Sequence, residues 1–145
     1  MLSNNCSLCI RVEKLKAGTY PYLIHEFEHS WWLLGEHQYY QGYSVLLLKG
    51  HAREMTELSA QVAAAVFAEL LQAQRTVEKA IPHFKMNICS LGNVVDHVHW
   101  HLFPRYSDDP KRENPPWLQM KDFSTKNVTP EQAAATIASL RAFLQ

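Results

Sequence analysis

Between residues 97 and 102, histidine alternates with a bulky apolar side chain at every second position. The histidines are His97, His99 and His101, and the apolar residues are Val98, Trp100 and Leu102. In a β-strand, successive side chains point to opposite faces of the sheet. The alternation therefore predicts a strand over residues 96–103 that buries an apolar face and presents three imidazoles on the other.

The three histidines are the candidates for chemistry. The ordinary pKa of imidazole lies near neutrality, so such a row suits nucleophilic attack, acid–base catalysis or metal binding. Neighbours on one face of a strand lie about 6.5–7 Å apart, because each residue rises by ~3.3 Å. Two neighbours can share one metal ion, but three on a regular strand converge only with difficulty. The spacing favours separate roles for the three over a three-histidine metal site or a chance row on the surface.

Size and composition narrow the class of protein. A chain of 145 residues with 47% apolar residues suits one domain with a packed core. The 14 basic and 14 acidic residues leave no basic excess for bulk nucleic-acid binding. Residues 1–5 lack the features of a signal peptide, and no apolar run reaches the ~20 residues of a membrane helix. We therefore expect a cytoplasmic protein without a membrane span.

Other segments supply the rest of the fold. Strands are expected at residues 20–28, 30–35, 43–49 and 84–90. The third is a continuous apolar run, as in a strand buried on both faces. Residues 53–80 have apolar side chains at helical spacing, with Thr56 or Ser59 as the cap and Ile81-Pro82 as the end.

The C-terminal part begins with an arm at residues 107–128, which is rich in proline and charge and has no period. Thr129 can cap a last helix, Pro130 suits its first position, and Gln132 completes a capping box. Together the elements predict an α+β fold with a mostly antiparallel sheet, one long helix and a C-terminal helix.

The row of histidines carries a family resemblance. Residues 97–103 resemble the His-x-His-x-His-x-x signature of the histidine triad (HIT) superfamily, in which x is hydrophobic. The upstream run that starts at Gly42 and ends in Lys-x-His at His51 is also typical. The flanks at residues 91–95, 108–110 and 115–117 resemble a bacterial branch of small HIT proteins, similar to diadenosine polyphosphate hydrolases and nucleotide phosphoramidases. The resemblance covers about residues 6–118. It implies one HIT domain over residues 1–145, with a core at about 6–106 and an arm and helix at 107–145.

The resemblance also implies a mechanism. His99 is the expected nucleophile, attacking the α-phosphate of a nucleotide to form a covalent nucleotidyl–histidine that water then resolves. A neutral imidazole suits this task, and two easier displacements replace one difficult step. The other ring nitrogen of His99 must donate its proton to a fixed acceptor, for which we expect a backbone carbonyl of the neighbouring strand. His101 is expected to contact the phosphate and help the leaving group.

Substrate contacts are predicted on both sides of the triad. Asn93 stands where many relatives have a glutamine that binds phosphate, and Ser90 stands near another polar contact. Both can donate to phosphate oxygens, a large term in catalysis, although each can equally be an ordinary structural residue. Trp117, in the polar arm, is expected to reach the substrate pocket or a dimer partner.

Two positions depart from the family pattern. Tyr43 stands where many relatives have a histidine near the phosphates. Tyrosine can still donate a hydrogen bond, but its ordinary pKa of about 10 makes it a weaker acid–base group. Gly35 stands where relatives have an aspartate or asparagine that holds the ribose, and the adjacent Glu36 is the candidate substitute.

Cys6 and Cys9 form a C-x-x-C pair near the N-terminus. Such a pair alone can bind zinc, act in redox chemistry or be coincidental, and the thioredoxin-like βαβ context is absent. The resemblance implies a structural zinc site completed by His51 and His97. Two cysteines and two histidines form a closed tetrahedral set. The alternative is a metal-free thiol pair packed in the core.

These features lead to one expectation and three alternatives. The resemblance implies a homodimeric hydrolase of dinucleoside polyphosphates or nucleoside phosphoramidates that releases a nucleoside monophosphate. The alternatives are a nucleotidyltransferase or phosphorylase, a nucleotide-binding scaffold with incidental catalysis, and a zinc-dependent hydrolase.

Overall fold

The computed structural model describes residues 5–145. Residues 1–4, which include most of the segment without signal-peptide features, lie outside the described residues. The strands are β1 (Leu23–Glu26), β2 (Ser30–Leu34), β3 (Ser44–Leu48), β4 (Lys85–Cys89) and β5 (His99–Arg105). The helices are α1 (Ser7–Lys16), η1 (Met55–Glu57), α2 (Ala60–Ala80), η2 (Pro116–Lys126) and α3 (Pro130–Ala142), where η marks a 3₁₀ helix.

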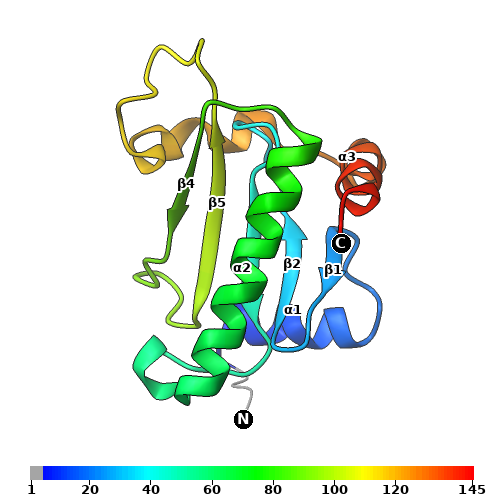
Figure 1. Ribbon diagram of the computed structural model, residues 1–145, viewed down its shortest axis with the longest axis vertical. Coiled ribbons are helices and arrows are strands. Elements are labelled where there is room, and N and C mark those ends of the chain that lie inside the picture. Colours follow the sequence, from blue (N-terminus) through cyan, green and yellow to red (C-terminus); the bar gives the residue numbers. More distant parts are fainter. Residues whose placement is uncertain (1–4) are drawn as a thin grey trace.

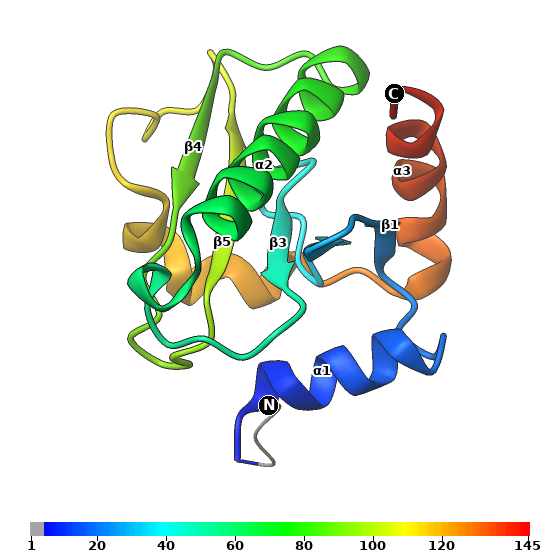
Figure 2. The same cartoon turned by 60° about the horizontal axis from the view of Figure 1, so that its bottom comes forward.

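The five strands form one antiparallel sheet in the order β1-β2-β3-β5-β4. The long helix α2 crosses one face of this sheet, while α1 and η2 lie on the other side (Figures 1 and 2). Helix α3 packs beside β1 at the edge of the sheet. This arrangement confirms the predicted α+β fold with a mostly antiparallel sheet, one long helix and a C-terminal helix.

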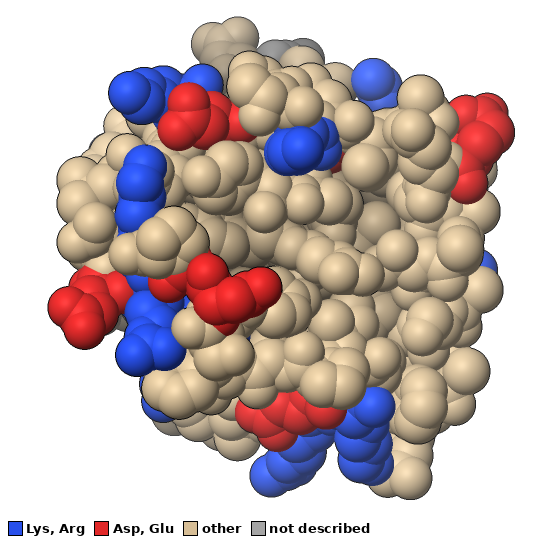
Figure 3. Space-filling model, turned by 90° about the horizontal axis from the view of Figure 1, so that it is seen from above, with Lys and Arg blue, Asp and Glu red and all other residues tan. Residues whose placement is uncertain are grey.

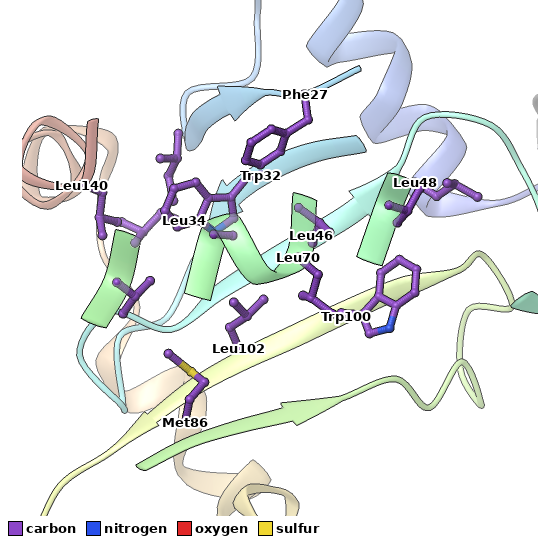
Figure 4. Packing of buried hydrophobic residues seen from close by; sticks show 14 of the residues in the cluster. Phe27, Trp32, Leu34, Leu46, Leu48, Leu70, Met86, Trp100, Leu102 and Leu140 are labelled. Atoms are coloured by element: carbon purple, nitrogen blue, oxygen red, sulfur yellow. The ribbon is translucent and has the colours of Figure 1, made fainter. Parts of the chain in front are cut away.

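The main core lies between α2 and the sheet. Trp100 and Leu102 of β5 pack there against Leu46 of β3 and Leu70 of α2 (Figure 4). Val98 joins the same cluster. The apolar half of the alternating segment is therefore buried as predicted, and the histidines face the side that α1 and η2 cover.

The strand that carries the histidines starts later than predicted. We expected it over residues 96–103, but β5 begins at His99, and His97 lies before it. Val98 bonds to two separate backbone groups, donating to the Ala52 carbonyl at 2.9 Å and accepting from the Leu48 amide at 3.2 Å. The chain therefore bends toward residues 48–52 before it enters the sheet.

Helix α1 was not anticipated from the sequence. Its buried residues Leu8, Val12 and Leu15 follow helical spacing and pack against Trp31 and Leu47 on the second face of the sheet. Cys6 caps the helix, because its sulfur accepts a hydrogen bond from the Cys9 amide at 3.4 Å.

Both helices have a predicted cap, but the main helix starts later than predicted. Thr129 and Gln132 form the predicted capping box of α3, with Pro130 as the first helical residue. The main helix begins at Ala60, not at residue 53, because Ser59 caps it and Leu58 is extended. Residues 55–57 form the separate turn η1 instead.

The charged surface agrees with the balanced composition. On the face in Figure 3, acidic and basic side chains lie next to one another around a broad uncharged middle, so no basic field covers it. Among residues 5–145, no helix is both long enough and apolar enough to cross a membrane.

A buried arginine holds the arm to the sheet. Arg105, at the end of β5, is 1% exposed. It donates to Asp109 at 2.7 Å, to Asn87 at 2.9 Å, and to the carbonyls of Lys111 and Asn114 at 2.8 Å each. These bonds fix the start of the arm that leads to η2.

Replacing Arg105 should destabilise the protein strongly. Arg105→Met keeps the apolar stem but leaves the Asp109 carboxylate and two carbonyls without their donor. We expect the free energy of unfolding to fall by about 3 kcal/mol, measured by urea denaturation. Arg75→Met, at an exposed position of α2, is the control and should change it by less than about 0.5 kcal/mol. Equal, small effects of the two substitutions would contradict this role.

Candidate active site

His99 is held so that one ring nitrogen faces away from its anchor. The side chain is 9% exposed, and its Nδ1 lies 2.5 Å from the His97 carbonyl oxygen. Because a carbonyl only accepts, Nδ1 carries a proton, and in the neutral imidazole Nε2 then keeps a bare lone pair. A neutral imidazole with a bare Nε2 can act as a nucleophile.

The acceptor for His99 differs from the expected one. We predicted a carbonyl of the neighbouring strand, but the acceptor belongs to the same segment, two residues earlier. The ladder between β3 and β5 ends at the pair Leu47–His99. The His97 carbonyl therefore lies outside the ladder and can turn toward the imidazole.

His101 follows on the same face of β5 and is half-buried. Its Nδ1 lies 2.7 Å from the Tyr43 hydroxyl. Burial, together with the nearby His99 and His37, lowers the pKa of His101 to about 3. His101 is therefore neutral near pH 7. The edge of Trp117 approaches it, with the two ring centroids 4.8 Å apart.

His97 points away from the other two histidines, toward the cysteine pair. Its Nε2 lies 2.9 Å from the Leu48 carbonyl and donates to it, so Nδ1 is bare. Nδ1 lies 3.6 Å from the Cys6 sulfur and 3.5 Å from the Cys9 sulfur. Burial lowers the pKa of His97, although the bond to Leu48 opposes this effect.

The fourth member of this group is His51, whose Nδ1 lies 3.3 Å from the Cys9 sulfur. Ligand atoms of Cys6, Cys9, His51 and His97 all lie within 4.8 Å of one another. A tetrahedral zinc ion, with bonds of ~2.3 Å to sulfur and ~2.0 Å to nitrogen, separates such atoms by ~3.5 Å. The arrangement of the four residues therefore fits the predicted metal-binding cluster.

The donor set fits a structural zinc ion. Four protein ligands leave no open position for substrate. The Leu48 carbonyl orients His97 in the way that outer hydrogen bonds orient metal-binding histidines. A zinc ion held by these four residues would tie α1 and the loop after β3 to the start of the histidine strand.

Two pockets meet at His99. A polar pocket of about 510 Å³ is lined by Arg53, Ser90, Asn93, Asp96, His97 and His99, among others. An apolar pocket of about 360 Å³ is lined by Leu8, Val94, His99, His101, Trp117 and Met120, among others. Asn93 borders both pockets. A substrate at His99 therefore has a polar and an apolar side to occupy.

The structure brings three predicted substrate residues to these pockets and places two elsewhere. Asn93 and Trp117 line them directly, and Ser90 lines the polar pocket while its hydroxyl donates to the His99 carbonyl at 2.8 Å. Glu36 borders a separate pocket of about 140 Å³. Tyr43 borders that pocket too, and reaches His101 with its hydroxyl.

Four residues near the pockets were not predicted from the sequence, and two of them lie on helix α1. Arg11 and Tyr20 both donate to Glu36 Oε1, at 3.0 Å and 2.8 Å, and Leu8 lines the apolar pocket. Arg53, at the polar pocket, pairs with Asp96 at 2.7 Å. The helical spacing of Leu8, Val12 and Leu15 is a sequence signal that could have revealed α1, whereas a single arginine such as Arg53 gives no such signal.

The fold and the site together define a class of protein. An antiparallel sheet with a His-x-His-x-His row between a polar and an apolar pocket is a histidine-triad architecture. The chain belongs to the HIT domain family, whose model matches residues 19–108. This confirms the resemblance and gives the chain a nucleotide-binding and hydrolase fold. No match was found among curated proteins.

Solved structures agree with the family. A histidine triad protein from Marinobacter aquaeolei VT8 is 27% identical with a TM-score of 0.72, covering 91% of this chain and 93% of that one. A zinc-bound histidine triad family protein from Mycobacterium smegmatis is 22% identical with a TM-score of 0.67, covering 97% and 93%. Plasmodium falciparum diadenosine triphosphate hydrolase is 12% identical with a TM-score of 0.60, covering 85% and 76%. The last two show the fold alone.

Metal analysis can test the cysteine and histidine cluster. We expect the purified protein to bind about one zinc ion per chain, measured by plasma mass spectrometry. Cys9→Ser should lose most of this zinc and lower the melting temperature by about 5 °C or more. Cys89→Ser, at the one other cysteine of residues 5–145, should retain the zinc. A zinc content that is the same in all three proteins would refute the site.

Proposed function

We propose that this protein hydrolyses nucleotides through a covalent nucleotidyl–histidine intermediate on His99. The observation that carries the proposal is the bond from His99 Nδ1 to the His97 carbonyl, which leaves Nε2 bare where the two pockets meet. The proposal also rests on the HIT family, which includes hydrolases and transferases.

The proposed reaction has two displacements. The lone pair of His99 Nε2 forms a P–N bond to the α-phosphorus, and the bond to the leaving group breaks with its electron pair. The His97 carbonyl stabilises the positive charge that then develops on the imidazole. Water next attacks the same phosphorus and loses a proton, the P–N bond breaks, and a nucleoside monophosphate leaves with His99 restored.

The two pockets suit the two halves of a nucleotide. We assign the phosphates to the polar pocket, where the Asn93 amide and the Arg53 guanidinium can donate to their oxygens. We assign the base to the apolar pocket, beside Trp117 and Met120. Both volumes fall within the ~300–1,000 Å³ of small-molecule sites. Dinucleoside polyphosphates and nucleoside phosphoramidates are the proposed substrate classes.

The role of Glu36 as a ribose contact remains a prediction. Arg11 and Tyr20 both donate to its Oε1 atom, so Oε2 can accept from a ribose hydroxyl. The position of Glu36 on the smaller pocket means that a nucleoside bound there would lie apart from Trp117.

A homodimer is also proposed, on the basis of the family and of an open sheet edge. Strand β4 is an outer strand of the sheet (Figure 1). Phe84 precedes it, Ile88 lies within it and Leu91 follows it, and all three are exposed. An exposed apolar edge of this kind is a surface on which a second copy can pack.

Trapping the intermediate tests the proposal. Rapid mixing with a diadenosine polyphosphate, followed by an acid-free quench and intact-protein mass spectrometry, should show the mass of one adenylyl group. His99→Ala should give no adduct and lower turnover by about a thousandfold or more. His83→Ala, in the turn after α2 and outside both pockets, is the control and should behave as wild type.

The products separate the hydrolase from its alternatives. Nucleoside monophosphate alone supports hydrolysis, whereas nucleoside diphosphate formed in phosphate buffer supports a phosphorylase. If a panel of nucleotides gives neither adduct nor turnover, the proposal that the protein is an enzyme is contradicted, and a nucleotide-binding protein is favoured.

Trp117 tests where the base binds. Trp117→Ala removes the aromatic wall of the apolar pocket, and base–aromatic stacking is worth ~1–3 kcal/mol. We expect KM for a diadenosine polyphosphate to rise about tenfold, with a smaller change in kcat. Leu118→Ala, at the exposed next position of η2, should leave both unchanged. An unchanged KM in Trp117→Ala would place the base elsewhere.

A further inference from the structure

The two departures from the family pattern, Gly35 and Tyr43, are one structural unit. A Cβ atom at position 35 would lie 2.1 Å from Cδ1 and 2.3 Å from Cε1 of the Tyr43 ring. Real Cβ atoms essentially never approach so closely, and the ring of a buried tyrosine cannot easily move aside. Position 35 must therefore be glycine for the ring to occupy this place.

Neighbouring aromatic rings fix the plane of Tyr43. The ring stacks between Phe103, with centroids 4.4 Å apart and 6° between planes, and His37, with 4.4 Å and 17°. Tyr43 is only 6% exposed. Its hydroxyl therefore has a defined position, and that position is 2.7 Å from His101 Nδ1.

The direction of this hydrogen bond follows from the two groups. Burial raises the pKa of Tyr43, so the hydroxyl keeps its proton. Within residues 5–145, His101 Nδ1 is the sole hydrogen-bond partner that the hydroxyl has. A hydroxyl that donates to Nδ1 leaves the imidazole proton on Nε2.

We propose that Tyr43 is a positioning residue that holds His101 as its Nε2–H tautomer, and that Gly35 provides the room for it. His101 then acts as a neutral hydrogen-bond donor, not as an imidazolium acid. The identity of the substrate atom that receives this bond, a phosphate oxygen or the leaving group, rests on the proposed function. The assignment of the His101 tautomer is independent of the proposed function.

The surroundings of His101 agree with a neutral donor. On its own strand, His101 contacts His99 and Phe103. The neighbours from other elements are Tyr43, which precedes β3, Trp117 of η2, and Cys89 of β4, which pairs with His101. The charges that act on it come from His99 and His37, and both lower its pKa. A carboxylate that could stabilise an imidazolium is absent from this set.

Tyr43→Phe tests the proposal, because it keeps the stacked ring and removes only the hydroxyl. Long-range ¹H–¹⁵N NMR on histidine-labelled protein reports which nitrogen of His101 carries the proton. The wild type should show a bare Nδ1 and a protonated Nε2, and Tyr43→Phe should show a mixture or the reverse. We expect kcat on a diadenosine polyphosphate to fall about tenfold and KM to change less than twofold.

Tyr40→Phe is the matched control. Tyr40 is also a buried tyrosine packed against Phe103, but its hydroxyl has no hydrogen-bond partner among the described residues. Removing that hydroxyl should leave the His101 tautomer and kcat as in wild type. Equal losses in the two variants would indicate a packing effect and overturn the positioning role.

Gly35→Ala displaces the ring without changing the hydroxyl, and it should give the same tautomer mixture as Tyr43→Phe. Gly50→Ala is its control, since a Cβ at position 50 meets no atom within 4 Å. A His101 spectrum unaltered in both Tyr43→Phe and Gly35→Ala would overturn the proposal. If the wild type has the Nε2–H tautomer of His101 but turns over no nucleotide, the positioning role of Tyr43 is supported and the proposed function is contradicted.

Discussion

His97 is the residue on which the rest of the site depends, because each of its polar groups holds a different part of the molecule. Its Nδ1 faces the Cys6 and Cys9 sulfurs, its Nε2–H donates to Leu48 of β3, and its carbonyl accepts from His99. A fully buried imidazole must have its hydrogen bonds satisfied. Here that requirement ties the start of α1, the sheet and the nucleophile to one residue, and it forces β5 to begin only at His99.

The different roles of the three histidines follow from this constraint. A regular strand would present all three at equal spacing toward one side. Because His97 lies before the strand, it turns to the cysteines, while His99 and His101 stay beside the two pockets. The two remaining histidines are then anchored at Nδ1 by different partners, a carbonyl for His99 and a hydroxyl for His101. Identical side chains thereby acquire different roles, with a bare Nε2 on one and, in our proposal, a protonated Nε2 on the other.

The sequence predicted the parts of this arrangement that have a local pattern. Period-two alternation assigned Trp100 and Leu102 to the core, and Thr129, Pro130 and Gln132 identified the last helix. The metal-binding cluster came from family resemblance, since no local rule brings residues 6 and 97 together. The contact between Tyr43 and His101 spans 58 positions in the chain, and its dependence on Gly35 is a matter of three-dimensional space. Helix α1 has apolar residues at helical spacing, but no helix was predicted for residues 7–16.

The central claim is that the His97 carbonyl fixes the tautomer of His99 and so exposes a bare Nε2 to substrate. The most direct measurement is the ¹⁵N NMR spectrum of His99 in the folded wild-type protein, assigned by comparison with His99→Ala. We expect a proton on Nδ1 and the coupling pattern of an unprotonated Nε2 near neutral pH. A spectrum with the proton on Nε2 would contradict this claim, because a protonated Nε2 cannot attack phosphorus. It would also contradict the role of the His97 carbonyl in fixing the His99 tautomer.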